Sequence, residues 1–126
     1  MISTKIFIPA RYESSRFPGK PLAKIKGKEM IIRVAEICKK VISQKNIFVA
    51  TDDNRIKKIC KKYSINCLMT SKKCKTGTDR VFQASRKTKS DIIINVQGDE
   101  PLIKSSDIKK IIKAKKKFKN HVICGY

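Results

Sequence analysis

Residues 8–22 have the sequence IPARYESSRFPGKPL and directly continue the apolar run Ile6-Phe7-Ile8. The apolar run is typical of a buried strand, so the residues after it are expected to form a loop at its end. That loop carries the three cations Arg11, Arg16 and Lys20, together with small hydroxyl residues and the breakers proline and glycine. Open α/β sheets bind ligands at the carboxyl ends of their strands. The stretch therefore indicates a site for an anionic ligand such as a polyphosphate.

Apolar runs and helix-period stretches alternate along the rest of the chain. The spacing predicts strands over 5–9, 46–50, 65–69 and 91–96, and helices over about 30–43, 54–63, 79–86 and 105–117. Residues 22–30 are expected to form a hairpin-like link, and 121–126 begin another strand. This alternation implies parallel strands with right-handed crossovers. We therefore expect a single α/β domain over 1–126, with a Rossmann-like, mostly parallel sheet flanked by helices.

Several residues can be assigned to helix ends and to the core. Thr78 is the expected N-cap of the third helix, and Asp52 or Asp53 is expected to cap the second. Capping alone is favoured for these aspartates, with ligand contact as the alternative. Phe82 is predicted to face the core, and so are two cysteines that lie beside isoleucine on helix faces, Cys38 and Cys60.

The charge is strongly basic, with 31 Lys and Arg against 10 Asp and Glu and a net charge of +21. Such an excess is compatible with nucleic-acid binding. Lysine dominates it, however, and is spread over three of the four predicted helices, while arginine is sparse. Solvated helix faces are therefore favoured, with no specific nucleic-acid partner.

The remaining composition bears on metals and location. The 5 cysteines form no C-x-x-C pair and there is 1 histidine, so no zinc site is indicated. No apolar run approaches the ~20 residues that cross a bilayer, and the chain starts without a separate apolar signal region. We expect a cytoplasmic protein that does not insert into membranes.

A second motif, NVQGDEP, covers residues 95–101 and follows the fourth predicted strand. Gly98 allows close approach of the backbone to a ligand. Asp99, just past a central strand, offers the anionic oxygen that Mg²⁺ prefers. Two loops at neighbouring strand ends, one cationic and one with a metal-binding acid, together suit a nucleoside triphosphate with Mg²⁺.

These motifs resemble CMP-Kdo synthetases (3-deoxy-manno-octulosonate cytidylyltransferases), whose loop pattern is close to IPAR-x-x-S-x-R-x-PGKPL and whose second motif is NVQGDEP. Residues 49–52, VATD, extend the resemblance, as does MTSKKCKTGTDR over 69–80. The family pattern there is close to MTS-x-x-H-x-SGTDR, so Cys74 replaces a histidine and Thr76 a serine. The resemblance covers essentially all of this chain but only the amino-terminal portion of the family. The chain is therefore expected to be truncated, without the carboxyl-terminal sugar-binding half.

The resemblance implies roles for named residues. Lys20, Arg16 and Asp99 would be catalytic, with Asp99 holding Mg²⁺. The nucleotide would be contacted by Ala10, Arg11, Ser15, Arg16, Lys20, Ser71, Arg80, Gln97 and Gly98. For Arg80, a structural ion pair with Asp79 or another neighbour is the alternative.

The implied reaction is transfer of a cytidylyl group from CTP to Kdo, giving CMP-Kdo and pyrophosphate for lipopolysaccharide synthesis. The implied fold is that of the nucleotide-diphospho-sugar transferases, and a full-length relative would be a homodimer. Three alternatives remain open: a CTP-binding fragment without turnover, a related polysaccharide-pathway cytidylyltransferase, and a basic nucleic-acid binder.

Overall fold

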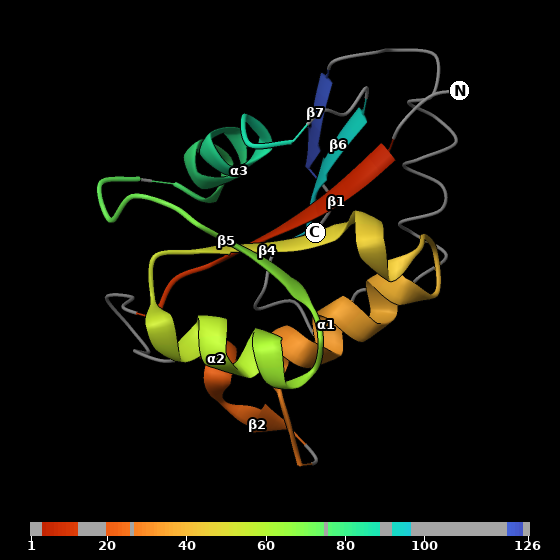
Figure 1. Cartoon of the computed structure of the whole chain (residues 1–126), viewed down its shortest axis with the longest axis vertical. Coiled ribbons are helices and arrows are strands. Elements are labelled where there is room, and N and C mark those ends of the chain that lie inside the picture. Colours follow the sequence, from red (N-terminus) through yellow and green to blue (C-terminus); the bar gives the residue numbers. More distant parts are fainter. Residues whose placement is uncertain are drawn as a thin grey trace.

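The computed structural model describes residues 4–12, 20–25, 27–74, 76–88, 92–96 and 121–124. Five strands form one sheet in the order β5-β4-β1-β6-β7, and every neighbouring pair is parallel (Figure 1). The strands are β1 Thr4–Ala10, β4 Ile47–Thr51, β5 Asn66–Met69, β6 Ile92–Asn95 and β7 His121–Cys124. The expected parallel α/β fold is confirmed.

Helices connect and cover the strands. They are α1 Met30–Lys39, α2 Asn54–Lys62 and α3 Gly77–Ser85, with short 3-10 turns η1 Lys20–Leu22 and η2 Gln44–Asn46. The expected hairpin-like link is the antiparallel pair β2 Lys24–Ile25 and β3 Lys28–Glu29. Gly27 turns it with a φ of 86°, a conformation that favours glycine.

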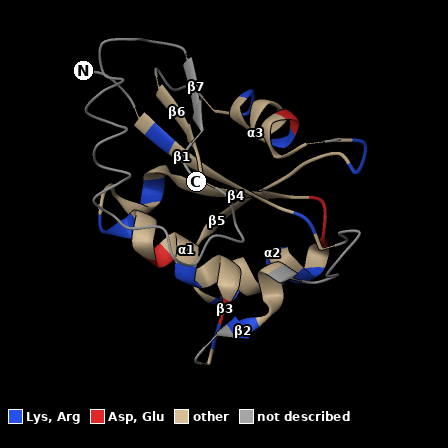
Figure 2. Ribbon diagram, turned by 180° about the vertical axis from the view of Figure 1, so that it is seen from behind, with Lys and Arg blue, Asp and Glu red and all other residues tan. Residues whose placement is uncertain are grey.

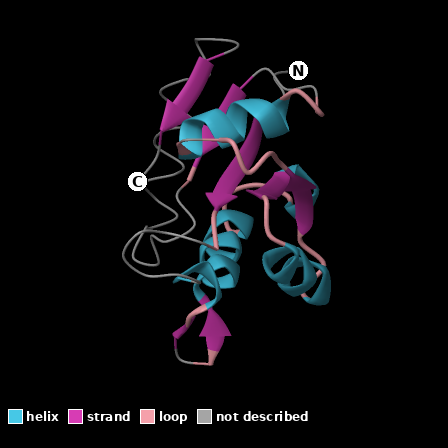
Figure 3. Cartoon of the chain, turned by 90° about the vertical axis from the view of Figure 1, so that its left-hand side faces the viewer, coloured by secondary structure: helices cyan, strands magenta, loops and turns pink. Residues whose placement is uncertain are grey.

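The two faces of the sheet bury different sets of side chains, because successive residues of a strand point to opposite faces. Ile6 and Ile8 of β1 pack in the cluster that contains the buried residues of α2 and most of those of α1. Phe7, between them, packs in a second cluster with Val81 and Ala84 of α3. Helices α1 and α2 therefore cover one face and α3 the other, which makes three layers (Figures 1 and 3).

Some local predictions were wrong. Helix α1 ends at Lys39 rather than near residue 43, because the N–H groups of Val41 and Ile42 both turn back to the Cys38 carbonyl. The N-cap of α3 is Thr76, not Thr78, and its side-chain oxygen accepts from Asp79 N–H at 3.0 Å.

Other predictions on side chains can also be compared with the structure. Phe82 is 49% exposed, so its expected core position is wrong. Asp53 caps α2 as expected, while Cys38 and Cys60 are fully buried free thiols, as expected. The helix predicted over 105–117 lies outside the described residues.

Basic side chains are distributed over several elements, with Lys and Arg on all three described helices and on the β2–β3 hairpin (Figure 2). On α1 and α2 this distribution fits the interpretation of solvated helix faces, whereas the one Lys or Arg of α3 is the buried Arg80. Within the described ranges, no helix combines the length and apolar character needed to cross a membrane.

Candidate nucleotide site at the carboxyl edge of the sheet

Strands β1, β4, β5 and β6 run in the same direction, so their carboxyl ends meet at one edge of the sheet. Arg11, Asp52 and Thr70 are the first residues after β1, β4 and β5, whose last residues are paired in register. On the other side of β1, Val96 follows β6 and donates its N–H to the Phe7 carbonyl at 3.0 Å. The topology thus brings together loops that are far apart in the sequence.

A cavity of 240 Å³ opens at this edge, between the segments that follow β1, β4 and β5. Three cations and two carboxylates are among its lining residues, Arg11, Tyr12, Asp52, Asp53, Arg55 and Lys72. Each carboxylate is paired with an arginine. Arg11 and Lys72 are exposed and form no ion pair with any other residue that the structure describes. The cavity therefore presents uncompensated positive charge, which suits an anionic ligand.

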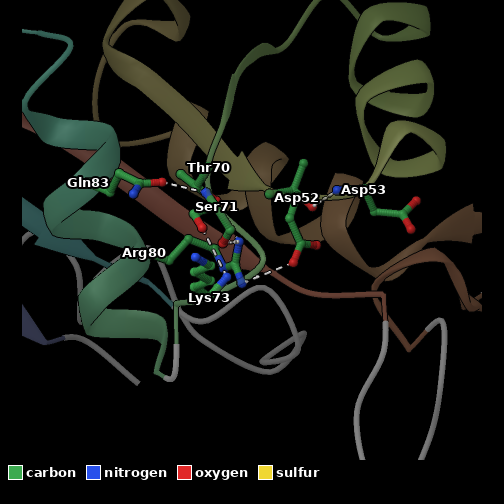
Figure 4. Close-up of polar contacts among 8 residues, drawn as sticks. Asp52, Asp53, Thr70, Ser71, Lys73, Arg80 and Gln83 are labelled. Carbon is green, nitrogen blue, oxygen red and sulfur yellow. Dashed lines mark hydrogen bonds and ion pairs between the residues drawn. The ribbon is translucent and has the colours of Figure 1, made fainter.

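Arg80 does not line this cavity, but its guanidinium contacts two of the segments around it, those after β4 and β5 (Figure 4). Its side chain, which projects from α3, is completely buried. Nη1 donates to Thr70 Oγ1 at 2.5 Å and to the Ser71 carbonyl at 3.4 Å, and Nη2 lies 3.4 Å from Asp52 Oδ2. The guanidinium thus fixes the ends of β4 and β5 relative to each other.

These contacts bear on the role predicted for Arg80. The alternative of an ion pair with a neighbour is confirmed, and the partner is Asp52, from a segment 28 residues away in the sequence, rather than Asp79. Direct contact between Arg80 and a nucleotide stays a prediction, because the buried guanidinium bonds to protein groups in this structure.

The segment after β5 is held by hydrogen bonds on both sides. Thr70 N–H donates to the Thr51 carbonyl at 2.8 Å, which ties this segment to the end of β4. Ser71 N–H donates to Gln83 Oε1 of α3 at 2.5 Å (Figure 4), and Ser71 Oγ accepts from Lys73 N–H at 3.0 Å. Ser71 is half-buried beside the cavity residue Lys72, a position compatible with the predicted nucleotide contact.

The guanidinium of Arg55 stacks on the ring of Tyr12. The Arg55 guanidinium carbon lies 3.2 Å from the ring centroid, while Arg55 Nε and Nη2 donate to Asp53 at 3.1 and 2.7 Å. The side-chain hydrogen bond from Arg55 is the main cause that lowers the pKa of Asp53 below its ordinary value of 3.8. Asp53 is therefore an ionised carboxylate neutralised by Arg55 at neutral pH.

Cys74, at the position where the resemblance implied a histidine, does not line this cavity. It lines a second, more open hollow of 700 Å³ with Ser71, Lys73, Asp79, Phe82, Gln83 and Arg86. The exposed Phe82 belongs to the same hollow, so its ring faces this loop and not the sheet.

A family model for cytidylyltransferases matches residues 6–123. The chain belongs to the cytidylyltransferase family.

Curated relatives of this cytidylyltransferase chain have two related names. The chain is 46% identical over 114 residues to 3-deoxy-manno-octulosonate cytidylyltransferase 2 of Hydrogenovibrio crunogenus. The aligned stretch covers 88% of this chain and 46% of the relative. It is 45% identical over 114 residues to 8-amino-3,8-dideoxy-manno-octulosonate cytidylyltransferase of Shewanella baltica, with the same two coverages of 88% and 46%. The predicted resemblance to CMP-Kdo synthetases is confirmed, and the chain spans about half the length of the curated relatives it matches.

A solved structure of CMP:2-keto-3-deoxy-manno-octonic acid synthetase in complex with CTP superimposes with a TM-score of 0.87 at 40% identity. The match covers 92% of this chain and 48% of the synthetase chain. The nucleotidyltransferase fold is therefore shared over nearly the whole of this cytidylyltransferase chain.

The predicted site residues of this cytidylyltransferase chain divide into two groups. Ala10 is the buried last residue of β1, Arg11 lines the cavity and Lys20 begins η1. Ser71 and Arg80 lie at the same edge, as described above. The remaining predicted residues, Ser15, Arg16, Gln97, Gly98 and Asp99, lie outside the described residues.

Sequence reasoning did not single out three cavity residues, Tyr12, Arg55 and Lys72. Nothing in the sequence distinguishes Arg55 and Lys72 from the many other exposed cations of this chain. Among the residues that the structure describes, no three or more of His, Cys, Asp and Glu form a metal-binding cluster. The predicted Mg²⁺ ligand, Asp99, is outside those residues, three positions after Val96.

Proposed function

We propose that this chain is the nucleotide-binding part of a cytidylyltransferase that transfers a cytidylyl group from CTP to 3-deoxy-manno-octulosonate, with release of pyrophosphate. The observation that carries this proposal is the cationic cavity at the carboxyl edge of the sheet. It occurs in a chain that shares 40% identity with a synthetase solved in complex with CTP. Curated relatives with the corresponding name support the choice of donor and acceptor.

In this proposal the residues after β1 bind the donor. Arg11, Arg16 and Lys20 hold the triphosphate, and Lys72 adds a cation from the segment after β5. Cytidylyl transfer depends mainly on positioning of the substrates and stabilisation of the developing charge. Cations held on rigid strand ends can supply both. The anomeric hydroxyl of the acceptor sugar attacks the α-phosphorus in line and pyrophosphate leaves.

The second motif completes the proposed site. Asp99 would hold Mg²⁺, since a carboxylate and triphosphate oxygens are the hard oxygen ligands that this ion takes. When bound, the ion supplies electrophilic polarisation of the α-phosphate. Gln97 and Gly98 would lie between the nucleotide and the sugar, while Ala10, Ser15 and Ser71 would contact the nucleoside. Arg80 acts behind them by holding the ends of β4 and β5.

The acceptor has a second candidate. The names of the relatives at 46% and 45% identity differ only in the substituents of the eight-carbon acid sugar. A competition assay with equal concentrations of Kdo and 8-amino-3,8-dideoxy-manno-octulosonate separates them through the ratio of the two nucleotide sugars formed. The lipopolysaccharide pathway, a cytoplasmic location and a homodimeric assembly belong to the same proposal, and each stays a prediction.

The direct test is pyrophosphate release from CTP in the presence of Mg²⁺ and Kdo. At a CTP concentration of ~100 times Kd, ligand binding should add about 2.7 kcal/mol to the stability of the chain. Lys20→Ala should remove most of this stabilisation. Lys58→Ala, which removes a cation from the exposed side of α2, is the matched control and should retain it.

Other outcomes favour the alternatives. Stabilisation by CTP without pyrophosphate release supports a nucleotide-binding module that lacks turnover. In a form that turns over, Asp99→Asn should lower the rate by about a hundredfold or more, and near-normal turnover would remove Asp99 from the metal role. DNA or RNA affinity that persists at physiological salt, without any effect of CTP, would support the basic nucleic-acid binder.

A further inference from the structure

The segment that follows β1 is attached to α2 through one aromatic ring. β1 ends at Ala10, so Arg11 and Tyr12 are beyond the hydrogen-bonded sheet register. Tyr12 packs against the core cluster that α1 and α2 share, and its ring also carries the Arg55 guanidinium at 3.2 Å. The core and α2 therefore both restrain Tyr12. A peptide bond joins Tyr12 to the preceding residue, the cavity cation Arg11.

The plane of the guanidinium is itself fixed. Arg55 donates from both Nε and Nη2 to the two oxygens of Asp53, at 3.1 and 2.7 Å. A forked arrangement of this kind constrains orientation in a way that a single lysine ammonium cannot.

Asp53 is anchored in turn by the end of β4 and the start of α2. Its Oδ1 accepts the Arg55 N–H at 2.8 Å as the N-cap of α2, and its own N–H donates to Thr51 Oγ1 at 3.2 Å. A continuous series of contacts therefore runs from Thr51 through Asp53 and Arg55 to Tyr12, the residue that follows Arg11 in the sequence.

Arg55 also has an electrostatic effect on the cavity. Asp53 lines the cavity, and without Arg55 its carboxylate would repel an anionic ligand. The Arg55 side chain is 54% exposed, so the ion pair contributes little to folding stability. Arg55 is exposed, its guanidinium plane is fixed, and it stacks on the residue next to a cavity cation. A role in ligand binding explains this arrangement better than a role in folding stability does.

We propose that Arg55 is a positioning residue for the triphosphate: by stacking on Tyr12 and bonding Asp53, it fixes the backbone that presents Arg11 to the ligand. This inference rests on the proposed binding of CTP. It extends that function by adding Arg55, Tyr12 and Asp53 as residues that act through Arg11.

The test is calorimetric titration of CTP with Mg²⁺ into the wild-type chain and four variants. Loss of the stack in Arg55→Ala should weaken binding about tenfold, equivalent to ~1.4 kcal/mol. Arg55→Lys keeps the charge but not the flat fork, and it should still weaken binding about fivefold. Lys58→Ala removes a charge from the same helix without touching Tyr12, and should change affinity less than about twofold. Tyr12→Leu keeps an apolar side chain but removes the ring that carries the guanidinium, and should weaken binding about as much as Arg55→Ala does.

A second readout separates positioning from a general loss of structure. Hydrogen exchange at the Arg11 and Tyr12 amides should accelerate about tenfold in Arg55→Ala, while amides of β4 keep their protection. The melting temperature without ligand should stay within a few degrees of the wild type, because the ion pair is exposed.

The possible failures are distinguishable. If the wild type does not bind CTP, the proposed function fails and this inference fails with it. If the wild type binds CTP and Arg55→Lys binds equally well, the positioning role is overturned while the proposed function stands. Equal weakening by Arg55→Ala and Lys58→Ala would show that Arg55 contributes only charge, which also overturns the proposal.

Discussion

Asp52→Ala should destabilise this chain more than Arg80→Met does, although both variants break the same ion pair. Removal of Asp52 leaves a guanidinium whose side chain is 0% exposed and has lost its only carboxylate partner among the described residues. Removal of Arg80 leaves a carboxylate whose side chain is 17% exposed and can recruit water. The penalty for an uncompensated charge therefore falls mainly on the first variant.

The magnitudes follow from burial. Leaving one member of a buried pair without its partner costs about 3–5 kcal/mol, and the hydrogen bonds that Arg80 keeps to Thr70 and Ser71 place Asp52→Ala near ~3 kcal/mol. Arg80→Met replaces the guanidinium by an apolar side chain and should cost about 1–2 kcal/mol. The double variant should be no less stable than Asp52→Ala alone, because the methionine removes the orphaned charge.

Urea unfolding of the wild type, both single variants and the double variant gives the four free energies of the cycle. In a thermal scan, Asp52→Ala should melt roughly 10 °C below the wild type and Arg80→Met about half as far below. Equal losses, the reverse order, or strictly additive losses in the double variant would refute the reasoning, since each outcome means that burial of the guanidinium does not control the cost.

Three further predictions concern single groups. Thr76→Ala should destabilise the chain by about 1 kcal/mol through loss of the α3 cap, and Thr78→Ala by less than ~0.5 kcal/mol; equal effects in denaturant unfolding would contradict the cap assignment. The pKa of Asp53 is lowered in the folded chain, so the ionised Asp53 carboxylate stabilises the fold at pH values above its ordinary pKa of 3.8. This stabilisation is lost as the pH falls through the pKa of the folded chain. The stability of Asp53→Asn should consequently fall less steeply than that of the wild type below about pH 4, and parallel curves would count against the Arg55 contact. Burial raises the pKa of the Cys38 thiol to about 12, so mass spectrometry after alkylation of the native chain at neutral pH should find Cys74 modified well before Cys38.

The fold and the location of the site could be predicted because both follow from the order of the elements. Short apolar runs separated by helical stretches leave few alternatives to a parallel sheet, and a parallel sheet brings its carboxyl ends to one edge. Arg11 and Ser71 were found at that edge for this reason. The end of α1 could not be predicted from the sequence. The turn after Cys38 depends on backbone hydrogen bonds that no residue preference specifies.

The wrong assignments have local causes. Residues 76–78 have the sequence Thr-Gly-Thr, so either threonine satisfies the N-cap preference, and only the backbone geometry selects Thr76. In α3, Val81 and Ala84 already fill the contact with the sheet, and Phe82 is left facing the hollow beside the loop after β5. The pairing of Arg80 with Asp52 across 28 residues, and the stacking of Arg55 on Tyr12, depend on tertiary structure alone.

Both proposals require that a magnesium triphosphate binds where β1 and β6 both end. The direct measurement is paramagnetic broadening of backbone amide signals by CTP with Mn²⁺ in place of Mg²⁺. Lys5 and Arg11 are about 20 Å apart along β1, so the two ends of the sheet are readily separated by this short-range effect. If the triphosphate binds at this edge, the Arg11 and Val96 signals should broaden strongly while the Lys5 and Ile92 signals stay sharp. Equal or stronger broadening at Lys5 and Ile92, or none at saturating CTP, would contradict binding at this edge.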